Sequence, residues 1–371
     1  MDTLEAASTA EHAMIERAKR TGTPLSGSIE LLPLCNMNCD MCYVRLSKQE
    51  MDAQGRMRSG AEWLRLGAEM AKAGTLFLLL TGGEPLLHPD FKEIYLGLKR
   101  LGMILTINTN ATLIDESWAD FFGKYKPRRI NITLYGADAG AYENLCHYRP
   151  GFDRVINAVK LLKDRGVDVK LSSSLTPANR EDITDMLRIG EELGVPMRMD
   201  SYMMPACRER NKPFSQQNRL MPEEAAAARL EALRGEMGEE LFSQYRAQSL
   251  EQIDAFVPGE KAPCAVSCQA GRSSFTVNWQ GMLRPCVVMS EPQVSVFDLG
   301  FAEAWRTIRE RFGEVTYCAE CSVCSLRHLC RVCAAATLLE TGDYMGKPEY
   351  LCRYAAETAR LLRQMGEDSH E

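Results

Sequence analysis

The chain has 371 residues, of which 45% are hydrophobic and 25% charged. These proportions are ordinary for a globular protein and exclude disordered and fibrous classes, and the length allows two or three domains or one large domain with an appendage. The net charge of −6 does not favour a nucleic-acid or anionic-membrane partner. No apolar run is long enough to span a bilayer, and the N-terminus lacks the apolar core of a secretory signal. We therefore expect a cytoplasmic protein with no membrane and no nucleic-acid partner.

Apolar runs alternate with amphipathic stretches from residue 27 to residue 205. The runs predict strands, and the stretches between them predict helices. The predicted strands are 27–34, 75–80, 103–108, 129–135, 167–175 and 195–202, and the predicted helices are 60–73, 91–101, 114–124, 152–165 and 180–193. Consecutive strand–helix units imply a parallel sheet with right-handed crossovers. A closed barrel of this kind needs eight units, so we predict an α/β fold with an open, partial (β/α)6 barrel.

The composition of the chain changes after Pro205. Residues 222–248 are rich in Ala, Glu, Arg and Leu and predict a helix, whereas the chain from residue 261 onward is rich in cysteine, with short strands predicted at 274–278 and 283–289. These changes predict four parts. They are an N-terminal helical segment (1–26), the partial barrel (27–205), a helical bridge (206–260) and a small Cys-rich domain that is organised by metal (261–371).

The chain contains 14 cysteines. In a reducing compartment such a number indicates metal or redox chemistry more often than disulfides. Cys35, Cys39 and Cys42 directly follow the first predicted strand. A structural zinc site takes four ligands in a closed tetrahedron, but no fourth Cys or His follows until His88. Three thiolates on a four-iron cubane would instead leave one iron open to a small molecule.

The gaps of three and two residues in this cysteine loop resemble the signature of the radical S-adenosylmethionine (SAM) enzymes. The resemblance implies a [4Fe–4S] cluster on Cys35, Cys39 and Cys42 whose open iron binds the amino and carboxylate groups of SAM. It also implies that electron donation cleaves SAM to a 5′-deoxyadenosyl radical. In the family the chemistry lies at the C-terminal ends of the barrel strands, which is also where ligand sites of parallel sheets are expected.

The second predicted strand ends in Thr81-Gly82-Gly83-Glu84-Pro85, which resembles the motif that receives the amino group of SAM in this family. Glycines let a backbone approach a ligand closely, and a carboxylate can accept from an ammonium group. On the fourth and fifth strands, hydroxyl side chains stand where the family has polar SAM contacts, although ordinary strand hydroxyls are the alternative. Met41 stands where the family has an aromatic residue near adenine, and Tyr43 follows the third cysteine. The residues predicted to contact SAM are Gly82, Gly83, Glu84, Thr133, Ser172 and Tyr43.

Nine further cysteines lie between Cys264 and Cys352, which is more than one zinc site would use. Their spacing resembles the SPASM extension of radical SAM enzymes, which holds two auxiliary [4Fe–4S] clusters. The resemblance assigns Cys264, Cys268, Cys286 and Cys333 to the first auxiliary cluster and Cys321, Cys324, Cys330 and Cys352 to the second. Two residues separate Cys330 from Cys333, where the family usually has three. Cys146, Cys207 and Cys318 have no assigned role and could be buried small hydrophobes. Cys318 could also replace a neighbouring cysteine as a ligand.

Enzymes that resemble this chain mostly act on peptides or proteins and carry out a net oxidation. We therefore predict an oxidative modification of a ribosomally synthesised peptide, by a thioether or carbon–carbon cross-link. The alternatives are formylglycine formation, as in the anaerobic sulfatase-maturing enzymes, and dehydrogenation of a small molecule. The alternative outside enzymes is a zinc-scaffolded binding protein.

The same resemblance implies partners. The cofactors would be SAM and three [4Fe–4S] clusters, one that binds SAM and two that are auxiliary. An electron donor such as flavodoxin or ferredoxin would reduce the SAM-binding cluster. Only 26 residues precede the first predicted strand, which is short for a leader-binding domain, so either a separate protein would bind the leader or leader binding would be dispensed with. Tyr135, at the end of the fourth strand, is a candidate for packing against the substrate. The sequence does not identify a catalytic residue, the particular bond that is formed or the oligomeric state.

Overall fold

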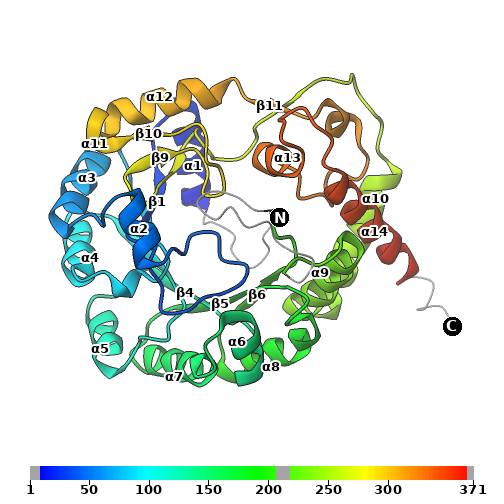
Figure 1. Ribbon diagram of the computed structural model, residues 1–371. Helices are drawn as coiled ribbons and strands as arrows, with labels where there is room; N and C mark the ends of the chain where they lie inside the picture. Colours follow the sequence, from blue (N-terminus) through cyan, green and yellow to red (C-terminus); the bar gives the residue numbers. More distant parts are fainter. Residues whose placement is uncertain (1–8, 206–217, 366–371) are drawn as a thin grey trace. The chain divides into compact units, whose positions relative to one another are not determined.

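The computed structural model describes residues 9–205 and 218–365 (Figure 1). The chain forms two compact units, each built from separate stretches of sequence. The first unit comprises residues 1–35, 44–108 and 267–314, and the second comprises residues 36–43, 109–266 and 315–371. The division into four parts that the composition suggested stays a prediction.

Parallel strands form the centre of the first unit. They are β1 (Ser26–Glu30), β2 (Phe77–Thr81) and β3 (Ile104–Thr109), and β2 pairs with both of the others. The helical elements between them are α1 (Thr9–Thr21), α2 (Lys48–Gln54), α3 (Gly60–Ala73), η1 (Pro85–Leu87) and α4 (Phe91–Arg100). In α3, a capping box between Ser59 and Glu62 fixes the first turn, and Gly74 in a left-handed conformation ends the helix. Its buried face includes Trp63 and Met70.

The Cys-rich part of the sequence extends this same sheet. It contributes β8 (Ser274–Val277), β9 (Met282–Arg284), β10 (Val294–Ser295), α11 (Val296–Leu299) and α12 (Phe301–Gly313). Strand β8 pairs in parallel with β1, and β9 and β10 follow as antiparallel neighbours. Ser28 donates a buried hydrogen bond of 2.9 Å to Thr276 across the first of these pairs. The added strands cover the edge of β1, which would otherwise expose unpaired backbone groups.

A second set of parallel strands lies in the second unit: β4 (Arg129–Thr133), β5 (Val169–Ser174) and β6 (Met197–Asp200). Its helical elements up to residue 254 are α5 (Glu116–Lys124), α6 (Ala139–Cys146), α7 (Gly151–Asp164), η2 (Arg180–Asp182), α8 (Ile183–Leu193), α9 (Pro222–Met237) and α10 (Glu239–Asp254). The single helix predicted over 222–248 is in fact two, because Gly238 adopts φ 78° and breaks the helical path. The sequence pattern did not predict α6, which has only eight residues.

The C-terminal part of the second unit has little strand. It contains β7 (Cys264–Ala265), β11 (Thr316–Tyr317), η3 (Ala319–Val323), α13 (Ala334–Thr341) and α14 (Glu349–Gln364). β7 and β11 pair in antiparallel orientation. A small buried core joins Leu230 of α9, Phe242 of α10 and Leu362 of α14. Leu329 belongs to the same core, so the packing of these helices supports the segment that carries Cys330.

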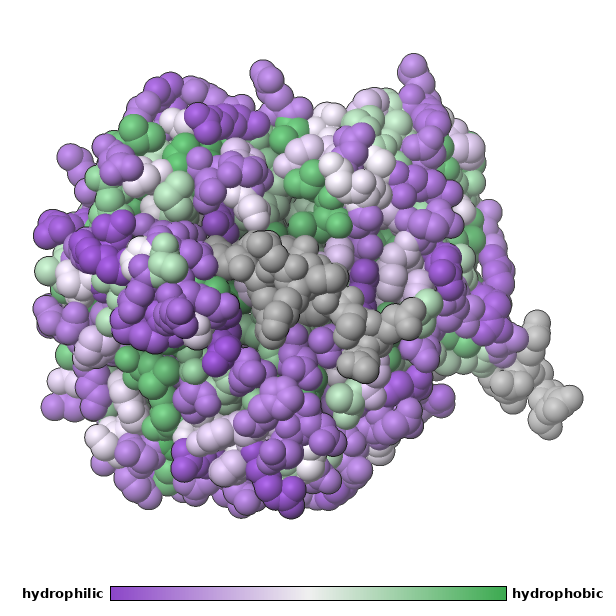
Figure 2. All heavy atoms as spheres, in the orientation of Figure 1, coloured by the Kyte–Doolittle hydropathy of each residue, from purple (hydrophilic) through white to green (hydrophobic). Residues whose placement is uncertain are grey.

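The six strands β1 to β6, with helices between them and parallel pairing within each unit, confirm the predicted α/β fold in its elements. On the face drawn in Figure 2, hydrophilic residues predominate and hydrophobic residues appear in small separate groups. None of the helices in the described part of the chain combines the length and apolarity that crossing a bilayer requires.

Candidate functional site

The loops that follow β1 and β2 are joined by backbone hydrogen bonds. The N–H of Gly83 donates to the carbonyl of Leu32 at 2.8 Å, and the N–H of Glu84 donates to the carbonyl of Leu34 at 2.9 Å. Cys35 is the next residue after Leu34. The fold thus brings the first cysteine of the loop beside the Gly-Gly-Glu turn, as expected for loops at the carboxyl ends of adjacent parallel strands.

The two glycines of this turn have no room for a side chain. A Cβ on Gly82 would lie 2.4 Å from the carbonyl oxygen of Leu32, and one on Gly83 would lie 2.3 Å from that of Leu34. Gly82 also has φ 145°, which other residues rarely adopt. The glycines therefore let one loop approach the other; that they also contact SAM stays a prediction.

Glu84 is wholly buried. One of its carboxylate oxygens, Oε1, accepts the N–H of Leu86 at 3.0 Å and so caps the short helix η1. This bond holds the carboxylate at the end of β2. Its predicted contact with the amino group of SAM stays a prediction.

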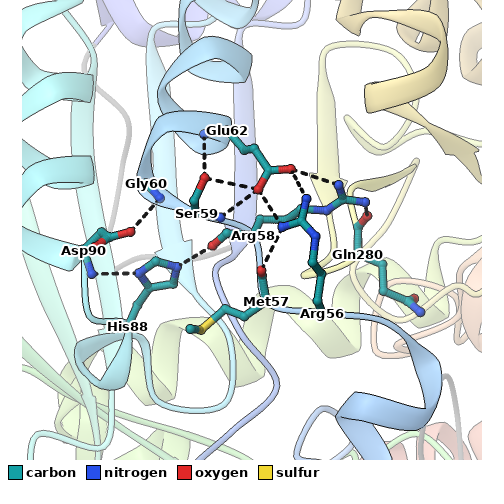
Figure 3. Close-up of polar contacts among 9 residues, drawn as sticks. All are labelled: Arg56, Met57, Arg58, Ser59, Gly60, Glu62, His88, Asp90 and Gln280. Carbon is teal, nitrogen blue, oxygen red and sulfur yellow. Dashed lines mark hydrogen bonds and ion pairs between the residues drawn. The ribbon is translucent and has the colours of Figure 1, made fainter.

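A histidine fixes the segment that follows Glu84 (Figure 3). The N–H of Asp90 donates to Nδ1 of His88 at 3.1 Å, so Nε2 carries the proton and donates to the carbonyl of Arg58 at 2.8 Å. Asp90 in turn accepts the N–H of Gly60 at 2.8 Å. Burial lowers the pKa of His88, which keeps the imidazole neutral. His88 therefore joins the loop after β2 to the loop before α3.

The same network continues to the start of α3 (Figure 3). Arg56 donates to both carboxylate oxygens of Glu62 at 2.8 Å, and Arg58 donates to Oε1 at 3.1 Å. The Arg56 guanidinium holds the pKa of the Glu62 carboxyl well below its usual range. Arg58 also donates to the carbonyl of Gln280 at 2.9 Å. The loop before α3, the loop after β2 and the turn between β8 and β9 are thereby joined.

The rest of the cysteine loop belongs to the second unit, where its first anchor is a group of polar side chains. Asn36 donates to Thr112 Oγ1 at 2.8 Å and accepts from the Asn110 side chain at 3.0 Å. Asn110 and Thr112 are buried. Further along the loop, the N–H of Cys42 donates to the carbonyl of Cys39 at 3.1 Å, which closes a tight turn between the two predicted ligands.

The second anchor is the C-terminal end of α6, which the sequence did not indicate. The N–H groups of Asn38 and Asp40 donate to the carbonyls of Cys146 and Leu145, at 3.1 and 3.0 Å. Cys39 lies between these two bonded residues in the sequence and is buried. The pairing joins positions more than 100 residues apart, and an unassigned Cys146 was the one sequence feature that could have drawn attention to it.

The thiol of Cys39 has hydrogen-bonding neighbours of its own. A hydrogen bond from Cys146, and a second from Tyr135, lower the pKa of Cys39. Tyr135 is held by Tyr142 of α6, because its N–H donates to the Tyr142 hydroxyl at 3.4 Å and the two rings pack edge to face at 5.8 Å. Tyr135, a candidate for substrate packing, thus lies against a predicted ligand.

The remaining predicted SAM contacts lie on strands or in the cysteine loop. Thr133 and Ser172 are direct partners in the register of β4 and β5, and both are half-buried. Their side chains therefore lie on the same face of the sheet. Tyr43 is half-buried, whereas Met41 is buried. Which of these four residues touch SAM stays a prediction.

Several of the later cysteines gather in the second unit. Cys264 on β7 pairs with Tyr317 on β11. Cys264 packs with Cys318 and Cys321 in one buried cluster, and Cys318 donates to the Glu320 carboxylate at 3.3 Å. Cys318, which the spacing left unassigned, therefore lies beside two predicted ligands.

Cys330 and Cys352 lie close together at the start of α14. Cys330 donates its S–H to the carbonyl of Leu351 at 3.7 Å, which places it beside Cys352. Burial raises the pKa of Cys330 to about 11. Cys333 caps α13 by accepting the N–H of Ala336 at 3.4 Å. The position of Cys330 beside Cys352 supports their assignment to one cluster, which stays a prediction.

The other predicted ligands differ in exposure and in unit. Cys268 and Cys324 are exposed and Cys286 is half-buried. Cys268 and Cys286 belong to the first unit, whereas Cys264 and Cys333 belong to the second, so their grouping stays a prediction. Cys207 lies outside the described residues.

The donor chemistry fits iron–sulfur clusters. The 13 cysteines in the described part of the chain are all free thiols, and soft thiolate ligands are those that such clusters take. Among the described residues, no three His, Cys, Asp or Glu side chains converge as the ligands of a single ion would. The thiolates of a cubane bind separate iron atoms and need not converge in that way.

Comparisons with known proteins agree with this geometry. Residues 29–189 match the sequence model of the Radical SAM superfamily. The AdoMet-dependent heme synthase of Methanosarcina barkeri is 23% identical over 346 residues, which cover 90% of this chain and 97% of that protein. The crystal structure of Streptococcus suis SuiB bound to precursor peptide SuiA has a TM-score of 0.67 at 15% identity, over 95% of this chain and 83% of that one. Native anSMEcpe with bound AdoMet and Kp18Cys peptide has a TM-score of 0.68 at 19% identity, over 94% and 100%. At such identities the two structures show a shared fold.

Proposed function

We propose that this radical SAM enzyme, in which residues 29–189 match the Radical SAM superfamily, oxidatively modifies a peptide. The favoured reaction is a thioether or carbon–carbon cross-link in a ribosomally synthesised peptide. Two proteins that share the fold over at least 94% of this chain, SuiB and anSMEcpe, have been seen with bound peptides. Their substrates support a peptide as the substrate class of this enzyme.

One observation carries the proposal: the loop that begins at Cys35 is fixed beside the Gly-Gly-Glu turn. The bond from Glu84 N–H to Leu34 O, at 2.9 Å, joins them directly. Cys35, Cys39 and Cys42 would hold a [4Fe–4S] cluster, and Gly82, Gly83, Glu84, Thr133, Ser172 and Tyr43 would surround SAM. When bound, this cluster and SAM supply a 5′-deoxyadenosyl radical that can abstract hydrogen from an unactivated carbon.

The chain's own residues would position these groups. The bonds from Gly83 and Glu84 keep the two loops together, and the buried Glu84 carboxylate is held at the end of β2 by Leu86. The hydrogen bonds of His88 and Glu62 fix the segment that follows the turn and join it to the loop before α3. Such fixed geometry lowers the entropy cost of aligning a cofactor with a substrate.

Two auxiliary [4Fe–4S] clusters are part of the proposal. Their ligands would be Cys264, Cys268, Cys286 and Cys333 for the first and Cys321, Cys324, Cys330 and Cys352 for the second. Auxiliary clusters can accept an electron from an oxidised substrate. Flavodoxin or ferredoxin would reduce the SAM-binding cluster, a separate leader-binding protein would present the peptide, and the reducing cytoplasm would suit the free thiols.

The test is an anaerobic assay for 5′-deoxyadenosine with reductant and SAM, on holoenzyme whose iron and sulfide are measured. We expect about twelve irons per chain for three cubanes. The combined variant Cys35→Ala, Cys39→Ala and Cys42→Ala should retain the auxiliary clusters and form no 5′-deoxyadenosine. Zinc without sulfide in the wild-type protein would refute the proposal, as would SAM cleavage by the triple variant. Candidate peptides that lose hydrogen mass on incubation would identify the modification.

A second candidate function is suggested by the length of one match. The chain covers 97% of the AdoMet-dependent heme synthase of Methanosarcina barkeri, so heme formation by this enzyme is the competing proposal. The same assay with an iron porphyrin precursor in place of peptide separates the two. Heme absorbance that appears only with SAM would favour the second candidate, and a peptide mass shift would favour the first.

A further inference from the structure

Strand β6 ends in a carboxylate on the face of the sheet that carries two predicted SAM contacts. Asp200 is the direct partner of Ser174 in the register of β5 and β6. Ser174 lies two residues after Ser172, which pairs with Thr133. Because side chains alternate between the two faces of a strand, Asp200, Ser172 and Thr133 share one face. Ligands of parallel sheets bind at the carboxyl ends of the strands, so Asp200 stands at the edge of the proposed site.

The Asp200 carboxylate joins this end of β6 to a segment that carries a later cysteine. Its Oδ1 accepts the N–H of Tyr202 at 3.1 Å, which fixes the carboxylate. Its Oδ2 accepts from the Arg331 guanidinium at 2.6 Å, and Arg331 directly follows the predicted ligand Cys330. The side chains of Arg331 and Asp200 are 33% and 44% exposed. At that exposure the pair adds little stability, so its main effect is to orient the segment.

A second and more buried contact joins the chain just after β6 to α13. The Tyr202 hydroxyl donates to Glu340 Oε1 at 2.8 Å, and the Arg219 guanidinium forms an ion pair with the same carboxylate. The side chains of Glu340 and Arg219 are only 9% and 13% exposed. An ion pair buried to this extent depends on both partners, because the loss of one leaves the other charge without compensation.

Arg219 extends this contact to the helix that carries Cys352. Its guanidinium carbon lies 3.5 Å from the centre of the Tyr350 ring, which is close enough for a cation–π interaction. The Tyr350 hydroxyl donates to the carbonyl of Leu220 at 2.7 Å, which holds the ring in place. Tyr350 precedes Cys352 by two residues in α14. The end of β6 is therefore connected to the segments of both Cys330 and Cys352, two cysteines that lie close together.

We propose that Arg331 and Glu340 are positioning residues that hold the second auxiliary [4Fe–4S] cluster at the carboxyl end of β6. The inference rests on the proposed function, which assigns that cluster to Cys321, Cys324, Cys330 and Cys352. All four cysteines belong to the same unit as β6, so the contacts act within one compact body. A cluster held there lies beside the sheet face where the substrate would meet SAM, and such an arrangement works only if supporting residues keep it fixed.

The test measures how fast reconstituted anaerobic holoenzyme releases iron to the ferrous chelator bathophenanthroline disulfonate, together with the electron paramagnetic resonance signals of the reduced clusters. Arg331→Gln and Tyr202→Phe each remove one donor with little change of volume, and Glu340→Gln removes the charge of the shared carboxylate. In each variant we expect about four of about twelve irons to leave about fivefold faster than in the wild type. The signal that changes on addition of SAM, and 5′-deoxyadenosine formation with SAM and reductant, should keep their wild-type values.

Two further variants separate positioning from general damage. Arg331→Lys keeps the positive charge that meets Asp200 and should restore most of the wild-type rate of iron release. Arg353→Gln is the matched control. Arg353 directly follows Cys352, as Arg331 follows Cys330, but it pairs with Glu223 of α9 at 2.8 Å rather than with the end of β6. Its iron release should equal that of the wild type.

Unchanged iron release in Arg331→Gln and Glu340→Gln would overturn the inference, as would equally fast release in Arg353→Gln. Loss of the SAM-responsive signal in the same variants would also overturn it, because the contacts would then support the whole unit rather than one cluster. If Glu340→Gln does not fold, Arg331→Gln and Tyr202→Phe carry the comparison. A wild-type protein without auxiliary clusters would overturn that part of the proposed function and this inference together, whereas normal wild-type clusters with unchanged variants overturn this inference alone.

Discussion

Substitution of the two glycines after β2 tests whether the approach of the two loops depends on the absence of side chains. In Gly82→Ala, the residue would have to keep φ 145°, which costs about 1–3 kcal/mol for a residue other than glycine. Its Cβ would lie 2.4 Å from the carbonyl oxygen of Leu32, and relief of such overpacking costs about 1–3 kcal/mol more. The shift would also weaken the bond from Gly83 to Leu32, a loss of about 1 kcal/mol. We expect a total destabilisation of roughly 3–7 kcal/mol.

Two other glycines separate the contributions. Gly83→Ala brings the clash, at 2.3 Å from Leu34 O, without a positive φ, so about 2–4 kcal/mol is expected. Gly102 has φ 85°, and nothing lies within 4 Å of its hypothetical Cβ, so Gly102→Ala isolates the backbone strain at about 1 kcal/mol. The predicted order of destabilisation is Gly82→Ala, then Gly83→Ala, then Gly102→Ala.

The assay is anaerobic urea unfolding followed by tryptophan fluorescence, since the buried residues Trp63 and Trp279 report on the first unit. SAM binding and iron content are measured on the same samples. The Gly82 and Gly83 variants should lose SAM binding under conditions where the Gly102 variant keeps it. Equal destabilisation by Gly82→Ala and Gly102→Ala would refute the reasoning, because it would mean that the close contact between the loops contributes nothing to the free energy of unfolding.

Further outcomes are expected in the same unit. Glu62→Gln should destabilise by about 1–3 kcal/mol, because it removes the negative charge that Arg56 and Arg58 share. The lowered pKa of Glu62 means that wild-type stability falls below about pH 4, and the stability of the variant should fall less. His88 has a lowered pKa, so below about pH 6.5 the unfolded chain binds a proton that the folded chain does not, and acidification destabilises. In His88→Gln the free energy of unfolding should vary less with pH between 8 and 5.5, and an unchanged slope would contradict the neutral, buried imidazole. Trp305→Phe should cost about 1–2 kcal/mol in urea unfolding, because it removes the 2.7 Å bond from the indole N–H to Gly22 O; no change would show that the bond is dispensable.

Local sequence patterns predicted the strands well because buried parallel strands are short apolar runs. Residues 75–80 were predicted where β2 spans Phe77–Thr81, and residues 103–108 where β3 spans Ile104–Thr109. The sequence pattern did not predict the short helices. Helices α2 and α6 have seven and eight residues, too few for a clear period of 3.6. The pairing of β8 with β1 was not predicted either, because side-chain periodicity carries no information on backbone hydrogen bonds between distant segments.

The sequence by itself determined the chemical inventory: three closely spaced thiols after the first strand, a Gly-Gly-Glu turn after the second, and a later set of cysteines. Spacing is informative there because residues a few positions apart must lie close together in any fold. Only the tertiary structure decided what surrounds that inventory. The C-terminal end of α6 lies beside the cysteine loop because the carbonyls of Leu145 and Cys146 accept the N–H groups of Asp40 and Asn38, and these positions are more than 100 residues apart in the sequence. Such long-range contacts are set by packing rather than by local order, which is why the fourteen cysteines alone could not reveal them.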